Sequence, residues 1–294
     1  MRVLILGASG FLGGHVQAAL SAAGHQVVNA PPSSQLDLAG GCEALLRGTR
    51  PDAVVNCAGR TQGTDAELTL ANLTLVQQLI RAALTVEPHP RVVQLGSAAE
   101  YGPLAQVVSE DTPPQPDSAY GQSKLAATRA LLAAAPELDV TVLRVCNPVG
   151  AGQRPQTLPG RAARLFQQAL REHAPEVEFG DLSARRDFID ARDVARAVEL
   201  VLRAPPAEPL LNVGRGEAVP ARTLVRALAR LCRYPGQIHE HAAGSSRSGA
   251  LLWQRADVSR LRGLGWAPSY SLQDALDALW RDVEAHTAPR RTLA

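Results

Sequence analysis

The stretch Val3-Leu4-Ile5-Leu6-Gly7-Ala8-Ser9-Gly10-Phe11-Leu12-Gly13 decides the fold of this chain. An apolar run leads into three glycines, and residues 11–23 are then compatible with a helix. Glycine is needed where a backbone bends sharply or approaches a ligand, and the start of a helix offers unpaired N–H groups to a pyrophosphate. The spacing G-x-x-G-x-x-G differs from the simplest dinucleotide fingerprint, so a turn without a ligand is the alternative interpretation. The residues expected to contact a dinucleotide are Gly7, Ser9, Gly10, Phe11, Leu12 and Gly13.

The composition is typical of a globular enzyme. Of the 294 residues, 46% are hydrophobic and 20% are charged, which excludes a largely disordered chain. A net charge of +2 gives no electrostatic reason to expect a nucleic-acid partner. No apolar run reaches the length of a membrane span, and the N-terminus enters a strand without a signal peptide. We therefore expect a cytoplasmic protein.

Neither the cysteines nor the histidines predict a metal site. The cysteines have no C-x-x-C spacing, so we expect buried thiols in a reducing compartment. His239 and His241 flank Glu240, but no third ligand is near in sequence, and a surface strand is the favoured interpretation. The four cysteines are Cys42, Cys57, Cys146 and Cys232.

Strands and helices are expected to alternate through the first half of the chain. The expected strands are residues 3–6, 26–29, 36–38, 53–57, 91–95 and 140–145. This alternation predicts an α/β fold with a doubly wound parallel sheet of the Rossmann type. After Asn147 the sequence becomes rich in Gly and Pro and then mixes short strands with helices. We therefore predict a dinucleotide-binding domain from residues 1–146 and 181–204, and a smaller, discontinuous substrate-binding region from 147–180 and 205–294.

The end of the second strand is where the cofactor type is normally decided. A carboxylate there binds the ribose hydroxyls of NAD, and a nearby arginine favours the phosphate of NADP. Residues 29–34 contain neither, which favours NADP(H) over NAD(H), with Ser33 or Ser34 as donors to the phosphate. Asp37, followed by Leu38, could meet the adenine amino group, and capping of a helix by Asp37 is an equal alternative.

A Tyr and a Lys supply the candidate chemistry. Tyr120 and Lys124 are four residues apart on a predicted helix, so they share one face. The Lys ammonium favours the phenolate and brings the pKa of the Tyr towards the neutral range, where it can act as acid and base. Ser97, at the end of a neighbouring strand, can hold a substrate oxygen beside Tyr120 during hydride transfer. A second close approach to the cofactor is expected at Cys57, Ala58 and Gly59.

With these motifs the sequence resembles the extended short-chain dehydrogenase/reductase family of nucleotide-sugar epimerases, dehydratases and reductases. The resemblance covers essentially the whole chain. Its further pieces are Asn72, Arg144-Val145-Cys146-Asn147, Arg186-Asp187-Phe188 with Asp193, and Leu264-Gly265-Trp266-x-Pro268. It implies that Ser97, Tyr120 and Lys124 form the catalytic set, that Lys124 and Tyr120 also contact the cofactor, and that Asn72 helps to hold a water that relays protons from Lys124.

One departure from the family is informative. Dehydratases of this family have acids two and three residues before the Tyr-Gly pair, where this chain has Ala99 and Ala98, so a dehydratase is not expected. Glu100 is displaced by one position and is expected to be a surface carboxylate. The motifs are most similar to reductases of nucleotide-linked 4-keto-6-deoxyhexoses, particularly the GDP-linked mannose type. An NAD-dependent nucleotide-sugar 4-epimerase is the main alternative, followed by a reductase of another carbonyl compound and a dinucleotide-binding sensor without turnover.

The substrate contacts are expected in the second half of the chain. The resemblance places Asn147 and nearby arginines against the substrate. A guanidinium can bind phosphate oxygens in a bidentate fork, so arginines are the expected partners of a substrate diphosphate. The candidates are Arg154, Arg186 and Arg247, with a solvated surface arginine as the alternative for each. A homodimer through the helices that hold Asn72 and Tyr120 is typical of the family.

Overall fold

A six-stranded parallel sheet forms the centre of the protein. The computed structural model describes residues 1–32, 41–104, 106–241 and 253–286. The strand order is β10-β6-β4-β3-β1-β2. The chain adds β2 on one side of β1 and the later strands on the other side, as in a doubly wound fold. The strands are β1 (Arg2–Leu6), β2 (Gln26–Asn29), β3 (Ala53–Asn56), β4 (Arg91–Ser97), β6 (Val140–Val145) and β10 (Leu210–Val213). The predicted α/β class with a doubly wound parallel sheet is confirmed.

The sixth strand of this sheet comes from late in the chain. β10 pairs with β6, with Leu211 opposite Leu143, although residues 205–294 were predicted to belong to the substrate-binding region. The strand predicted at residues 36–38 lies outside the described residues. A short apolar segment after the proline-rich linker is thus long enough to add a strand to the free edge of β6.

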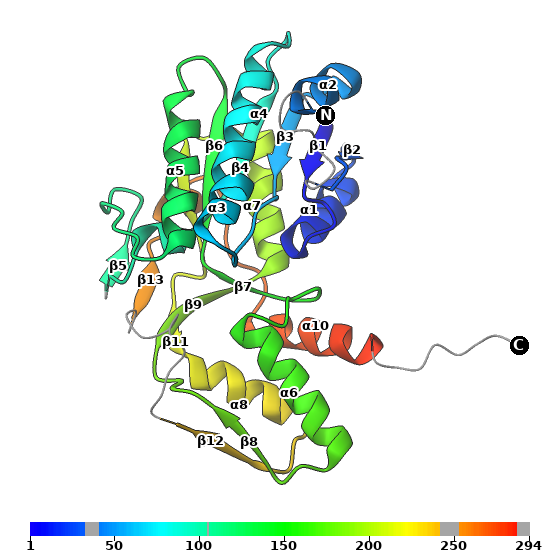
Figure 1. Ribbon diagram of the computed structural model, residues 1–294, viewed down its shortest axis with the longest axis vertical. Helices are drawn as coiled ribbons and strands as arrows, with labels where there is room; N and C mark the ends of the chain where they lie inside the picture. Colours follow the sequence, from blue (N-terminus) through cyan, green and yellow to red (C-terminus); the bar gives the residue numbers. More distant parts are fainter. Residues whose placement is uncertain (33–40, 105, 242–252, 287–294) are drawn as a thin grey trace, which may run out of the picture.

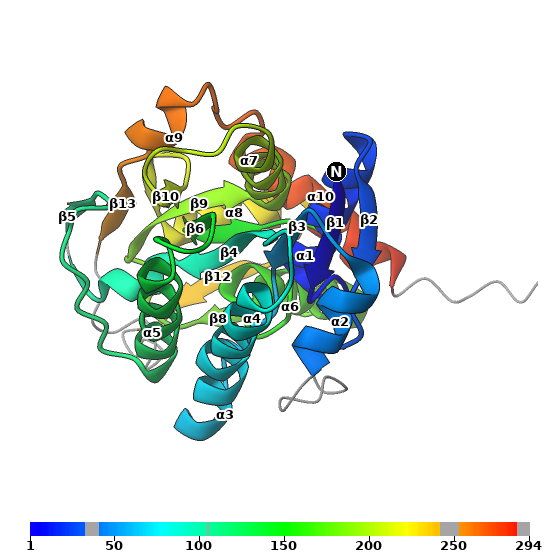
Figure 2. The ribbon, with the colours of Figure 1, turned by 90° about the horizontal axis from the view of Figure 1, so that it is seen from above.

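Helices cover both faces of the sheet because both faces of the strands are apolar. Val3 and Ile5 of β1 pack towards α1 (Phe11–Ala22), α7 (Ala191–Arg203) and α9 (Ser259–Gly263). Leu4 and Leu6 face the opposite way, towards α2 (Gly41–Thr49), α4 (Leu75–Leu84) and α5 (Ala119–Ala133). Figure 2 shows the sheet between these two helical layers.

The helical segment before β4 is interrupted at Asn72. The segment begins with α3 (Asp65–Thr69), in which Thr64 and Glu67 form a reciprocal capping box. It continues through one π-helical turn, η2 (Leu70–Thr74), into α4. Such single wide turns are frequent at functional sites. The turn contains Asn72, whose side chain is buried.

A smaller unit lies beyond the carboxyl ends of the sheet strands, in the lower half of Figure 1. Its helices α6 (Leu158–Glu172), α8 (Ala221–Leu231) and α10 (Leu272–Ala285) pack around the buried ring of Phe166. A three-stranded sheet orders β11 (Ala218–Pro220), β9 (Arg185–Asp190) and β7 (Asn147–Val149), and β8 (Glu176–Phe179) pairs with β12 (Gln237–Glu240). The proline-rich segment between β4 and α5 contains a further strand, β5 (Gln106–Val108), parallel to β13 (Gln254–Ala256).

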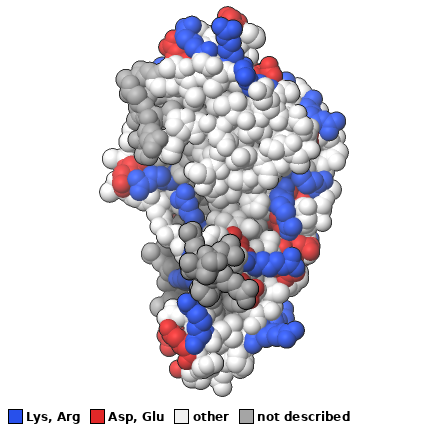
Figure 3. Space-filling model, turned by 90° about the vertical axis from the view of Figure 1, so that its right-hand side faces the viewer, with Lys and Arg blue, Asp and Glu red and all other residues white. Residues whose placement is uncertain are grey.

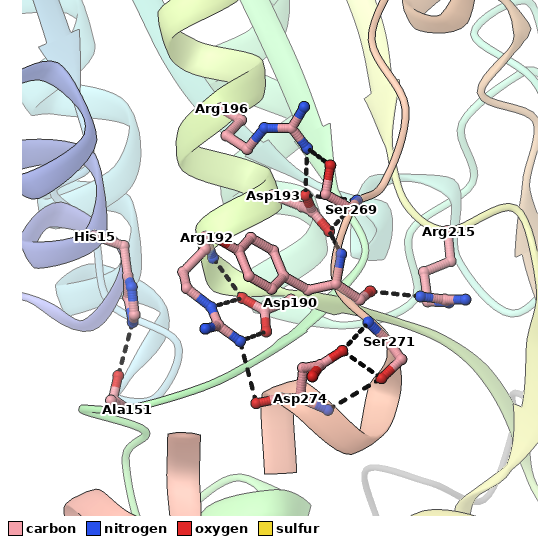
Figure 4. Close-up of polar contacts among 11 residues, drawn as sticks. His15, Ala151, Asp190, Arg192, Asp193, Arg196, Arg215, Ser269, Ser271 and Asp274 are labelled. Atoms are coloured by element: carbon pink, nitrogen blue, oxygen red, sulfur yellow. Dashed lines mark hydrogen bonds and ion pairs between the residues drawn. The ribbon is translucent and has the colours of Figure 1, made fainter. Parts of the chain in front are cut away.

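Two buried carboxylates join the smaller unit to the sheet domain. Asp193, near the start of α7, accepts hydrogen bonds from the backbone N–H groups of Ser269 and Tyr270. Figure 4 shows Asp193 and Arg196 facing Ser269, just before the start of α10. Asp187 of β9 accepts from the N–H groups of Arg215 and Gly216 and, at 3.3 Å, from that of Ala256. These bonds fix the path of the chain between the two units.

Charges of both signs are mixed on the surface. Figure 3 shows Lys or Arg side chains beside Asp or Glu side chains around the edges of one face of the molecule, with an uncharged area in its upper middle. Among the described residues of that face, the basic side chains form no continuous patch. In the part of the chain that the structure describes, no helix is long and apolar enough to cross a membrane.

Candidate active site

The glycine turn is shaped to receive a phosphate group. Gly7 has a positive φ of 75°, and a Cβ on Gly13 would lie 2.0 Å from the carbonyl oxygen of Gly7. Gly10 is the N-cap of α1 and has no side chain with which to cap the first N–H groups. These groups are consequently open to an anion at the positive end of the helix. The turn can thus accept an anion, and its role in binding a dinucleotide pyrophosphate stays a prediction.

The loop after β3 contacts this glycine turn, at the point where the order of the strands reverses. A Cβ on Gly7 would lie 2.7 Å from both the Cα and the N of Ala58, so only a glycine permits this approach. The side chain of Asn56, at the end of β3, accepts a hydrogen bond of 3.0 Å from the N–H of Ala58. Burial raises the pKa of the Cys57 thiol to about 12, so this thiol is neutral at physiological pH. The predicted cofactor residues Cys57, Ala58 and Gly59 thus lie beside the glycine turn.

Tyr120 and Lys124 lie on the first two turns of α5, whose N-cap is Ser118. Lys124 is buried, and its Nζ donates a hydrogen bond of 2.6 Å to the carbonyl oxygen of Leu95 on β4. Burial lowers the pKa of the Lys124 ammonium, and the nearby carboxylate of Glu100 acts in the opposite direction. Tyr120 is half-buried one helical turn before it. The shared face that the spacing predicts is therefore turned towards the end of β4.

Ser97 is the last residue of β4 and the N-cap of the short helix η3 (Ala98–Tyr101). Its hydroxyl oxygen accepts a hydrogen bond of 3.2 Å from the N–H of Ala99. A Cβ on Gly121 of α5 would lie 2.5 Å from the carbonyl oxygen of Ala99, so the two elements touch through a glycine. This contact places the Tyr120 end of α5 directly against the turn that holds Ser97.

Glu100 is not the surface carboxylate that we expected. Its side chain has no exposed area and forms an ion pair of 2.8 Å with Arg144 of β6. The sequence-based expectation was wrong because the partner lies 44 residues away, on the adjacent strand. The turn after β4 folds the carboxylate inward, beneath Ser97.

Asn72 makes three hydrogen bonds, each of 2.9 Å. Its Oδ1 accepts from the N–H of Arg60, and its Nδ2 donates to the carbonyl oxygen of Arg60 and to the Oγ of Ser123. A Cβ on Gly59 would lie 2.7 Å from this Oδ1, so Asn72 also contacts the second cofactor loop. Asn72 therefore ties that loop to α5, and its role in holding a water remains a prediction.

The smaller unit brings two of the predicted substrate residues onto one sheet. Asn147 of β7 donates from Nδ2 to the carbonyl oxygen of Asp187 on β9, at 3.0 Å. Arg186, the preceding residue on β9, is half-buried, and burial lowers the pKa of its guanidinium. Within the described residues Arg186 forms no ion pair, so its charge is available to an anion. Arg154 is exposed on the loop before α6.

Some predicted residues lie outside the described part of the chain, and others make surface contacts. Asp37, Leu38, Ser33, Ser34 and Arg247 belong to the first group. The Nε2 atoms of His239 and His241 lie 3.1 and 3.5 Å from carboxylate oxygens of Glu176 and Glu178. Three or more side chains arranged to hold a metal ion are not found among the described residues. All four cysteines are free thiols, and Cys57 and Cys232 are only half-buried.

Comparisons with known proteins show the family of this chain. The family model for the NAD dependent epimerase/dehydratase family matches residues 3–214. The chain belongs to this family. The enzyme is 36% identical to dTDP-6-deoxy-L-talose 4-dehydrogenase (NAD(P)(+)) of Kitasatospora kifunensis, over 98% of this chain and 96% of the relative. It is 29% identical to GDP-6-deoxy-D-mannose reductase of Pseudomonas aeruginosa, over 97% of each chain.

A solved structure shows the same fold. The structure of RMD from Pseudomonas aeruginosa complexed with NADPH superimposes with a TM-score of 0.86, at 27% identity, covering 97% of this chain and 99% of that one. This NAD(P)-dependent enzyme is therefore an extended short-chain dehydrogenase/reductase, as its motifs indicated, and its relatives act on nucleotide sugars.

Proposed function

We propose that this enzyme reduces the 4-keto group of a nucleotide-linked 6-deoxyhexose with NAD(P)H. The observation that carries the proposal is the junction of α5 with the end of β4. It combines the acid–base pair Tyr120 and Lys124 with the hydroxyl of Ser97, while the positions that would hold dehydratase acids are Ala98 and Ala99. The names of the relatives, a 4-dehydrogenase and a reductase, support this reaction class.

The chain's own residues would divide the chemistry as follows. When bound, NAD(P)H supplies the hydride that the carbonyl carbon of the sugar receives. Ser97 donates a hydrogen bond to the carbonyl oxygen, and Tyr120 gives that oxygen its proton. The Lys124 ammonium, one helical turn away, stabilises the phenolate that remains. The products are the 4-hydroxy sugar and the oxidised cofactor, and Tyr120 regains its proton from solvent.

The cofactor and the sugar would approach from opposite sides of this junction. The pyrophosphate of the cofactor is assigned to the glycine turn, where a Cβ on Gly13 would fill the cradle. The diphosphate of the substrate is assigned to the smaller unit, with Arg186 as the cation and Asn147 beside it. We favour NADP(H), since Asn29, at the end of β2, offers no carboxylate that would repel the extra phosphate. A homodimer through the helical segments that hold Asn72 and Tyr120, η2 and α5, and a cytoplasmic location complete the proposal.

The test is turnover on a panel of substrates with purified enzyme. NADPH and NADH oxidation is followed with dTDP-linked and GDP-linked 4-keto-6-deoxyhexoses, and the sugar product is identified by chromatography and NMR. We expect stoichiometric oxidation of the cofactor and formation of a 6-deoxyhexose. Interconversion of 4-epimers by enzyme that retains NAD, without net NADPH consumption, would establish the epimerase instead. Binding of NADPH without turnover on any keto sugar would refute the proposal.

A further inference from the structure

A buried ion pair lies directly behind the candidate active site. Glu100 accepts a hydrogen bond of 2.9 Å from the backbone N–H of Ser97 through Oε1 and one of 2.8 Å from the Nε of Arg144 through Oε2. The side chain of Glu100 is fully buried and that of Arg144 is 3% exposed. Burying two charges is costly unless they are well paired, so this arrangement requires an explanation.

The surrounding residues are fitted to this pair. Gly96 lies opposite Arg144 in the register of β4 and β6, and a Cβ on Gly96 would lie 2.8 Å from the Oε1 of Glu100. The guanidinium of Arg144 packs 4.5 Å above the ring of Tyr101, whose hydroxyl donates to Asn212 of β10 at 2.7 Å. The carboxylate is therefore held in one place by a neighbouring glycine, a cation and an aromatic ring.

Glu100 acts on Lys124 through its negative charge, in addition to its hydrogen bond with Ser97. Lys124 donates to the carbonyl oxygen of Leu95, and Glu100 accepts from the N–H of Ser97, two residues further along β4. Glu100 and Cys57 both act to raise the pKa of Lys124, against the effect of burial. The Cys57 thiol is neutral at physiological pH because burial raises its pKa to about 12. The carboxylate of Glu100 is thus the negative charge that opposes the burial of Lys124.

We propose that Glu100 is a positioning residue that fixes Ser97 through its backbone N–H and holds a negative charge at the end of β4, where Lys124 is bonded to Leu95. Because its side chain has no exposed area, Glu100 acts through Ser97 and Lys124. The catalytic consequence rests on the proposed function, because it assumes that Ser97 and Lys124 serve the reduction. The structural and electrostatic consequences do not depend on it.

The sequence offers an unusually direct probe. Lys124 is the single lysine of the chain, so protein made with lysine isotopically labelled at Cε gives one lysine signal in NMR. Titration of this signal measures the pKa of Lys124 without any turnover. In Glu100→Gln we expect this pKa to fall by about one unit or more, since a neighbouring negative charge is removed. We also expect faster hydrogen exchange at the N–H of Ser97, because Ser97 and Arg144 bond to different oxygens of the carboxylate and the single amide oxygen of Gln can take only one of these two positions.

Glu110→Gln is the matched control. Glu110 is also a buried carboxylate of this region, and it accepts a hydrogen bond of 2.7 Å from the N–H of Asn212. The same substitution there should leave both the pKa of Lys124 and the exchange of Ser97 at their wild-type values. An unchanged Lys124 pKa in Glu100→Gln, or an equal fall in Glu110→Gln, would overturn the proposal.

A double variant guards against loss of folding. Glu100→Gln leaves Arg144 buried without its counter-charge, which is destabilising. Glu100→Gln with Arg144→Met removes both charges, and the Gln oxygen is then free to accept from Ser97. We expect protection of the Ser97 N–H to return while the pKa of Lys124 stays below the wild-type value. Return of that pKa to the wild-type value would show that the unpaired Arg144, and not the missing carboxylate, caused the shift, and would overturn the electrostatic part.

Kinetics then connect the two consequences to catalysis. With a keto sugar that the wild type reduces, kcat of Glu100→Gln should fall about 10-fold to 100-fold with KM little changed. The alkaline limb of its pH profile should move to lower pH, because the Lys124 and Tyr120 pair loses its first proton more easily. If the wild type reduces no keto sugar, the proposed function fails, whereas the NMR titration still decides the role of Glu100.

Discussion

Replacing Asp193 by Ala tests how the smaller unit is fastened to the sheet domain. The carboxylate is fully buried, and it accepts from the N–H of Ser269 at 3.0 and 3.1 Å and from that of Tyr270 at 3.0 Å. An Ala side chain leaves these two N–H groups without an acceptor, and each such loss costs about 1–3 kcal/mol. Arg196 loses an ion pair but is 43% exposed, so its share is small. We expect the free energy of unfolding to fall by about 3–5 kcal/mol.

The assay is equilibrium unfolding in urea, with Asp139→Ala as the matched control. Asp139 forms a surface ion pair of 2.7 Å with Arg91 and is 48% exposed, so the same truncation there should cost about 1 kcal/mol or less. Asp193→Asn should fall between the two, since an amide oxygen can still accept from one or both N–H groups. Equal losses for Asp193→Ala and Asp139→Ala would refute the assignment of Asp193 as the acceptor that joins the units.

Two further predictions follow from buried groups. Burial raises the pKa of Asp187 to about 6 from its usual 3.8, so the native state holds this proton more tightly than the unfolded state. The free energy of unfolding should therefore fall as pH rises from about 4 to 6, by up to about 3 kcal/mol. Asp187→Asn stays neutral and should lack this component in urea unfolding at several pH values; the same pH dependence in both proteins would contradict the assignment. Gly13→Ala places a Cβ 2.0 Å from the carbonyl oxygen of Gly7, and the Kd for NADPH, measured by fluorescence titration, should rise at least about tenfold. Gly14→Ala is its control, because the nearest atom to that Cβ is 3.9 Å away; equal affinities of the two variants would remove Gly13 from the cradle.

The central sheet and the shared face of Tyr120 and Lys124 were accessible to sequence analysis because local patterns encode them. Val3 to Leu6 form a buried strand, and the glycine that follows has the positive φ that the turn needs. Tyr120 and Lys124 share a face because a helix has a fixed period. These features depend on neighbours within a few residues, so a single sequence is sufficient to predict them.

Contacts between distant segments were not predictable in this way. Glu100 and Arg144 are 44 residues apart, and nothing around Glu100 in the sequence indicates that its carboxylate turns inward. Asp193 and Ser269 are 76 residues apart in the sequence. The role of Asp193 as a hydrogen-bond acceptor is apparent only once α7 is in place. Both carboxylates are fixed by backbone N–H groups, which every sequence contains and which therefore carry no signal of their own.

The most direct test of the proposed reaction follows the hydride itself. The enzyme is supplied with NADPH that carries deuterium at the transferable position of the nicotinamide, together with a nucleotide-linked 4-keto-6-deoxyhexose. The account predicts one deuterium at C4 of the product sugar, and a decrease in its rate of appearance of about 100-fold or more in Tyr120→Phe. A product without deuterium at C4, or an undiminished rate in Tyr120→Phe, would contradict it.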